Sequence, residues 1–65
     1  MNYVLQVEKK QLNIIKVHYL DRLIDSKNPY VAWAAKDRAI TVTAYASGKV
    51  MFQGITAEQE YNDWY

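Results

Sequence analysis

The sequence predicts an α+β domain in the order β-α-β-β-β-α, with a four-stranded antiparallel sheet and two helices on one of its faces. Three observations support this prediction. A stretch with helical periodicity follows a short alternating strand, three strand-like runs separated by turn residues come next, and a second helical pattern closes the 65 residues. A chain of this length forms one domain, so we treat residues 1–65 as a single unit.

The first two elements are a strand and an amphipathic helix. In residues 3–7, Tyr3, Leu5 and Val7 alternate with Val4 and Gln6, as in a strand that buries one side. The stretch from about residue 10 to residue 24 has no Gly or Pro and carries apolar residues at helical spacing: Leu12, Ile15, Tyr19 and Leu23. The pair Asn28-Pro29 then marks a turn, because proline disfavours helical geometry in the residue before it.

Three strand-like runs follow, at residues 30–36, 40–45 and 49–53. A three-residue turn with Gly48 in the left-handed conformation would pair Thr43 with Met51 and Thr41 with Gln53. This register gathers the apolar side chains of the hairpin on one face: Ile40, Val42, Ala44, Val50 and Phe52. A two-residue turn would mix polar and apolar side chains on both faces, so we expect the three-residue turn.

A second helix closes the chain. Thr56 and Gln59 have the spacing of a capping box, and Ala57, Tyr61 and Trp64 form a packing stripe behind them. With both helices on the apolar side of the sheet, the predicted core is Leu5, Val7, Leu12, Ile15, Tyr19, Leu23, Val31, Trp33, Ile40, Val42, Val50, Phe52, Tyr61 and Trp64.

The other face of the sheet has no element left to cover it. Strand alternation places these side chains there: Gln6, Tyr30, Ala32, Ala34, Lys36, Thr41, Thr43, Tyr45, Lys49, Met51 and Gln53. The small residues keep the surface low, tyrosines can stack, lysines can meet phosphates, and glutamines can hydrogen-bond base or sugar edges. No acidic residue is among them.

Charge is distributed unevenly along the chain, although the net charge is only +1. Residues 26–54 hold four basic residues against Asp37 alone, whereas residues 55–65 hold three acids and no base. Such a separation can steer an anionic ligand toward the sheet. The residue types alone leave another interpretation open, because Thr and Tyr are common on a solvated strand face and lysines also protect sheets from aggregation.

The run from Thr41 to Gly54, TVTAYASGKVMFQG, resembles the hairpin of the N-terminal domain of bacterial ribonuclease HIII. Residues 4–7, residues 34–36 and the closing helix from Ala57 to Trp64 are similar as well, so the resemblance covers nearly the whole chain. The hairpin also resembles half of the TATA-box-binding protein, with its Ser-Gly-Lys corner, which implies a half-repeat of that fold.

The resemblance implies a single nucleic-acid-binding domain that is not itself an enzyme. In the family, this domain precedes a ribonuclease H catalytic domain that cuts the RNA strand of RNA/DNA hybrids with acidic residues and a divalent metal such as magnesium or manganese. By the same resemblance, Lys36 and Lys49 would contact phosphates, and Tyr45 stands where the TATA-box-binding protein has a wedging phenylalanine. The groove would be lined by Gln6, Thr41, Thr43, Met51 and Gln53.

A second wedging phenylalanine has no clear counterpart, since the positions near Tyr30 are alanines. A flat face suits the wide, shallow minor groove of a hybrid, which is closer to A-form than B-DNA is. The alternative function, of another class, is a protein-interaction or self-association domain that uses the same face through Tyr30, Tyr45 and Met51.

The sequence contains no convincing catalytic or metal-binding constellation. It has no cysteine and one histidine, His18, while Asp21 and Asp25 are typical of a solvated helix face. We therefore expect no cofactor within this chain, a monomer, no membrane segment and a cytoplasmic location. The chain stops one residue past the last packing position of its second helix. This favours a fragment of a longer protein over a short complete protein, and the resemblance implies that the fragment is the N-terminal part, with the catalytic domain absent.

Overall fold

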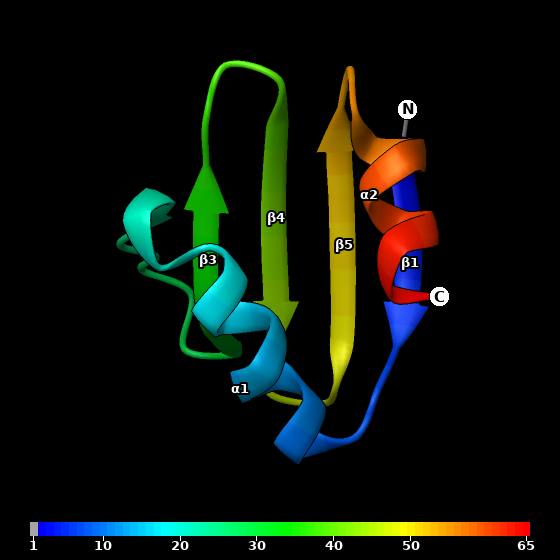
Figure 1. Ribbon diagram of the computed structural model, residues 1–65. Helices are drawn as coiled ribbons and strands as arrows, with labels where there is room; N and C mark the ends of the chain where they lie inside the picture. The colour runs from blue at the N-terminus through cyan, green and yellow to red at the C-terminus, as the bar shows by residue number, and fades with distance from the viewer. Residues whose placement is uncertain (1) are drawn as a thin grey trace.

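The computed structural model describes residues 2–65, which form one antiparallel sheet and two helices. The elements are β1 (Asn2–Gln6), α1 (Lys9–His18), the 3-10 helix η1 (Leu20–Arg22), β2 (Leu23–Ile24), β3 (Val31–Lys36), β4 (Ile40–Tyr45), β5 (Lys49–Gly54) and α2 (Ala57–Trp64). The strand order in the sheet is β1-β5-β4-β3-β2. Figure 1 shows α1 and α2 on the same side of the sheet, with α2 in front of β1. The predicted α+β class is confirmed, but the sheet has five strands and not four.

The fifth strand comes from residues that were predicted to be helical. α1 ends at His18, and Leu23 and Ile24 form β2, pairing with Ala35 and Ala34 of β3. Leu23 is 36% exposed and is not part of the core, so the prediction that it is a core residue was wrong. The Arg22 guanidinium donates to the carbonyl of His18 (3.2 Å) and to the Asp37 carboxylate (2.9 Å), so it ties the chain leaving α1 to the β3–β4 turn.

The core lies between the sheet and the two helices. Ile15 of α1, Tyr19 just after α1 and Phe52 of β5 are completely buried. The indole of Trp33 donates to the carbonyl of Leu12 (3.1 Å). Burial confirms nine of the predicted core residues: Leu5, Leu12, Ile15, Tyr19, Trp33, Ile40, Val42, Val50 and Phe52. Val7, Tyr61 and Trp64 are partly buried against this cluster.

The hairpin of β4 and β5 has the predicted register. Thr41 pairs with Gln53 and Thr43 pairs with Met51, and Gly48 has a φ of +100°, in the region that favours glycine. Its amide donates to the carbonyl of Tyr45 (2.9 Å), which closes the turn. The division of the hairpin into an apolar and a polar face follows from this register.

A β-bulge changes the alternation at the start of β3. Val31 pairs with Tyr45 and Trp33 pairs with Ala44, so Ala32 is an extra residue between them. Val31 therefore lies on the uncovered face and is half-buried, and its prediction as a core residue was wrong. From Trp33 to Lys36 the predicted alternation holds again.

α2 begins where the sequence predicts, but without the predicted capping box. Thr56 is at the N-cap position and makes no side-chain cap; its hydroxyl donates instead to the Glu60 carboxylate (2.7 Å). No helix within residues 2–65 is long and apolar enough to cross a membrane.

Candidate nucleic-acid interface

The sheet face opposite the helices, here called the open face, is built from three rows of side chains that run across the strands. The turn row lies next to the β4–β5 turn and contains Gln6, Lys49, Tyr45 and Val31. The middle row contains Val4, Met51, Thr43, Ala34 and Ile24. The far row contains Asn2, Gln53, Thr41 and Lys36. Cross-strand neighbours in such rows are close enough to bind one ligand together.

All the residues predicted to bind nucleic acid lie on the open face. Strand pairing brings Lys36, Thr41 and Gln53 together in the far row, and Thr43 and Met51 in the middle row. The turn row holds Gln6, Tyr45 and Lys49. Their place in the fold is as predicted, whereas their contact with a ligand stays a prediction.

The structure does not bring Lys36 and Lys49 together. They stand two strands and two rows apart, which corresponds to about 16 Å between their Cα atoms for ordinary strand spacing. Both side chains are exposed. The open face therefore has a positive charge near each end of its central strands, on β5 and on β3, and an uncharged band between them.

Gln6 has a structural contact that the sequence did not predict. Its side-chain amide donates to the carbonyl of Ser47 (3.1 Å), and the backbone amide of Val7 donates to the carbonyl of Gly48 (2.9 Å). The end of β1 is thus attached to the β4–β5 turn. This leaves the side-chain carbonyl of Gln6 as the group that can accept a hydrogen bond from a ligand.

The acidic residues lie elsewhere in the molecule. None of the open-face positions in the three rows is Asp or Glu, and the acids Glu58, Glu60 and Asp63 belong to α2 in the helix layer. Asp37, in the β3–β4 turn, accepts from the amides of Ala39 (2.8 Å) and Ile40 (3.1 Å) as well as from Arg22. The hydrogen bond from Ala39 first, then those from Arg22 and Ile40, hold the pKa of the Asp37 carboxyl below its usual value.

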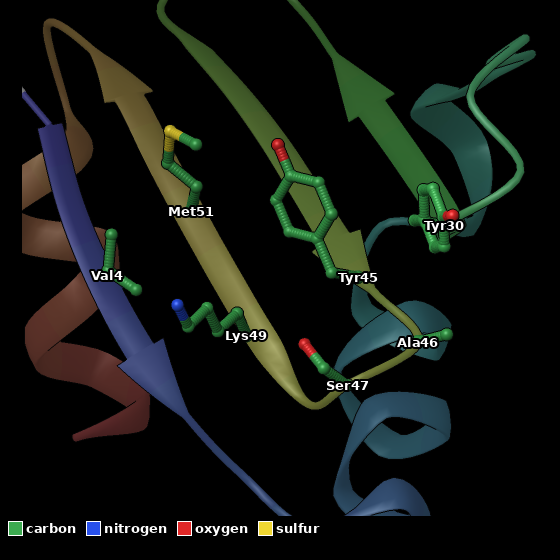
Figure 2. Close-up of a pocket in the computed structure, with 7 residues that line it drawn as sticks. All are labelled: Val4, Tyr30, Tyr45, Ala46, Ser47, Lys49 and Met51. Carbon is green, nitrogen blue, oxygen red and sulfur yellow. The ribbon is translucent and has the colours of Figure 1, made fainter.

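A hollow of about 520 Å³ opens on the turn and middle rows (Figure 2). It is lined by Val4, Tyr30, Tyr45, Ala46, Ser47, Lys49 and Met51. Val4 is 52% exposed and was absent from the predicted face, although it alternates with Leu5 in the same way as Gln6 does. Tyr30 was predicted on this face and lies at the edge of the hollow, 75% exposed.

Nothing in the described residues resembles a metal centre. Within residues 2–65, no group of three or more His, Cys, Asp or Glu side chains is placed to hold a metal ion. His18 contacts the rings of Tyr19 (4.9 Å between centroids) and Trp64 (5.4 Å), which is a packing role.

Comparison with known proteins links this fold to one family. Residues 2–65 match the model of a domain of unknown function, DUF3378. Ribonuclease HIII of Geobacillus kaustophilus is 43% identical over 63 residues, which are 97% of this chain and 20% of that protein. Ribonuclease HIII of Enterococcus faecalis is also 43% identical, over 97% of this chain and 21% of its own length.

Solved structures of ribonuclease HIII and RNase H3 contain a region with a fold similar to that of this chain. The crystal structure of Bst-RNase HIII in complex with Mn²⁺ superposes with a TM-score of 0.87 and 38% identity, over 100% of this chain and 21% of that chain. Aquifex aeolicus RNase H3 gives a TM-score of 0.81 over 95% of this chain and 25% of that chain; at 22% identity it supports the fold alone. The chain spans about a fifth of the length of the curated relatives it matches. It belongs to the DUF3378 family and corresponds to the N-terminal region of ribonuclease HIII.

Proposed function

We propose that this domain binds nucleic acid, and RNA/DNA hybrid in particular, through the open face, and so holds the substrate for the catalytic region of a ribonuclease HIII. The observation that carries the proposal is the charge pattern of this uncovered face. Lys36 and Lys49 stand near opposite ends of the central strands, and no acid interrupts the face. The band between the two lysines is low and uncharged, with Thr41, Thr43 and Met51. Lysines so placed reach phosphates, while the band meets the groove between them.

The shape of the face favours a hybrid over B-form DNA. About 16 Å separates the two lysine Cα atoms, which suits a wide, shallow groove better than the narrow minor groove of B-DNA, roughly 6 Å wide. No aromatic side chain stands in the middle row, which carries Thr43, Ala34 and the non-aromatic apolar side chains of Val4, Met51 and Ile24. Such a surface can lie along a shallow groove without bending the duplex.

The test is a titration of a labelled, blunt-ended RNA/DNA hybrid with the wild-type chain and with the double variant Lys36→Ala/Lys49→Ala, at several salt concentrations. Each lysine that neutralises a phosphate contributes close to one unit to the slope of log affinity against log salt. We expect the double variant to lose about two units of slope and about tenfold in affinity at low salt.

The matched control is Lys10→Ala/Lys16→Ala, which removes the same charge from α1 in the helix layer. This control should keep the wild-type slope, because its lysines lie on the opposite side of the sheet. Equal losses in the two double variants would mean that only net charge matters. An unchanged slope in Lys36→Ala/Lys49→Ala would refute the assignment of the open face.

Cleavage is assigned to the remainder of the ribonuclease HIII chain. We expect this chain to leave a labelled hybrid intact with magnesium or manganese present, since residues 2–65 hold no cluster of carboxylates suited to metal binding. A specific cut in the RNA strand by the pure chain would contradict this part of the proposal.

A further inference from the structure

Two tyrosines differ from every other aromatic side chain in the described chain. Phe52, both tryptophans and four of the tyrosines each contact another aromatic ring. Within residues 2–65, Tyr30 and Tyr45 have no ring contact and no side-chain hydrogen bond, and both line the hollow on the open face. These rings are therefore free to stack on a ligand.

The ring of Tyr30 is presented on a fixed backbone. The amide of Tyr30 donates to the side-chain oxygen of Asn28 (2.9 Å), and its carbonyl accepts from the amide of Ala46 (2.8 Å). Pro29, immediately before it, restricts the backbone further. Because the backbone is already fixed, binding of a ligand to this ring would have to order only the side chain and not the loop that carries it.

The rest of the hollow complements a small planar anion. Val4 and Met51 supply apolar surface, and the Lys49 ammonium supplies a positive charge beside them (Figure 2). The hollow of about 520 Å³ is within the usual range for a small-molecule site, which is about 300 to 1,000 Å³. It is therefore the size of one nucleotide rather than of a duplex.

We propose that this hollow binds one unpaired nucleotide next to the duplex, with its base stacked on Tyr30 or Tyr45 and its phosphate paired with Lys49. The inference rests on the proposed function, because the duplex beside the nucleotide would be held by the rest of the open face. Within a duplex both faces of a base are covered by its neighbours. Only an unpaired base offers a face to an aromatic side chain, and such stacking tolerates any base.

The experiment compares a blunt-ended hybrid with the same hybrid carrying a short single-stranded DNA overhang, at each end in turn. Wild-type protein should bind one of the overhang substrates at least about fivefold more tightly, as stacking of one base on an aromatic ring provides. Tyr30→Ala/Tyr45→Ala should remove this advantage, so that the variant binds the blunt-ended and the overhang hybrids with equal affinity. A 2-aminopurine in the overhang should be quenched by wild-type protein and not by the variant.

Tyr30→Phe/Tyr45→Phe should keep the overhang preference, because stacking needs the ring and not the hydroxyl. Tyr65→Ala, which removes an 83% exposed tyrosine outside the open face, is the matched control and should also keep it. Circular dichroism should show the wild-type fold for each variant. Equal wild-type affinity for blunt and overhang hybrids would overturn the inference while leaving the proposed function intact.

Two further results would also overturn the inference. If Tyr30→Ala/Tyr45→Ala weakens binding of the blunt hybrid as much as that of the overhang hybrid, the tyrosines serve the duplex. If wild-type protein binds neither substrate, both the inference and the proposed function fail.

Discussion

At the residue scale, Tyr19 shows how a polar group is accommodated in so small a core. Its side chain has no exposed surface, and its hydroxyl donates to the Glu60 carboxylate at 2.5 Å. Glu60 also accepts from the hydroxyl of Thr56, so one carboxylate joins Tyr19, just after α1, to the N-cap residue of α2. Burial first, and the hydrogen bond to Glu60 second, raise the pKa of the Tyr19 phenol well above its usual value of 10.

This shift predicts a loss of stability at alkaline pH. Above pH 10 the unfolded chain releases the Tyr19 proton while the folded chain keeps it, so the free energy of unfolding falls as pH rises. The slope for this residue approaches about 1.4 kcal/mol per pH unit. Urea unfolding between neutral pH and pH 12 measures how the free energy of unfolding depends on pH in wild type and in Tyr19→Phe. The variant should lose the slope that Tyr19 contributes.

Tyr65→Phe is the control, because Tyr65 is exposed and its substitution should leave the alkaline slope unchanged. Tyr3 also contributes to the alkaline slope in every variant, because its pKa is raised by partial burial and by its hydrogen bond to Glu58. The prediction is wrong if Tyr19→Phe and wild type lose stability in parallel.

The residues of the open face could be predicted singly because a strand alternates with a period of two. Once Gly48 fixes the turn, the sides of Thr43, Tyr45 and Met51 follow without any tertiary information. The hydrogen bond from the Gln6 side chain to the Ser47 carbonyl could not be predicted, because it joins residues that are distant in sequence.

At the element scale, the β4–β5 turn connects β1 to the hairpin and sets one end of the open face. A Cβ atom on Gly48 would overlap the carbonyl oxygen of Val7 and come within 2.8 Å of the Gln6 amide nitrogen. The φ of +100° is also unfavourable for any residue with a Cβ. Glycine is therefore required at this position for both conformation and space.

Gly48→Ala should lower the free energy of unfolding by about 2 to 4 kcal/mol. Urea denaturation measures the change. Ser47→Ala, in the same turn with an exposed side chain, should stay within about 0.5 kcal/mol of wild type. If Gly48→Ala and Ser47→Ala are equally stable, the prediction is wrong, because the turn then accommodates a Cβ atom at position 48 without loss of folding free energy.

The end of α1 could not be located from sequence. Leu23 has the spacing of the helical stripe, so local periodicity favours a helix through residue 24. The structure uses Leu23 and Ile24 in β2 because they can pair with Ala35 and Ala34, and because Arg22 bonds to Asp37. Both interactions are between segments that are distant in sequence, and tertiary contacts override weak local propensity.

At the scale of the whole molecule, the positive charges of the open face oppose self-association through that face. A face-to-face pair would bring the Lys36 and Lys49 charges of two copies near one another without an acid to neutralise them. The exposed side chains of Val4 and Tyr30 on the same face favour association instead, because apolar surface gains free energy when a partner covers it. This is the basis of the protein-interaction alternative.

We expect light scattering coupled to size exclusion to give the monomer mass of 7.6 kDa at both low and high salt. Charge repulsion between open faces opposes association most strongly at low salt, because salt screens the repulsion. A dimer that persists at all salt concentrations and does not bind hybrid would support the self-association alternative instead.

The sequence by itself determined the α+β class, the register of the β4–β5 hairpin and the side of the sheet on which each predicted binding residue lies. These features depend on local periodicity and on one glycine, so they are encoded over a few neighbouring residues. Only the tertiary structure decided the fifth strand, the bulge at Ala32 and the hollow beside Tyr30. Each of these depends on which segments pair across the sheet, and that choice is made by contacts between residues far apart in the chain.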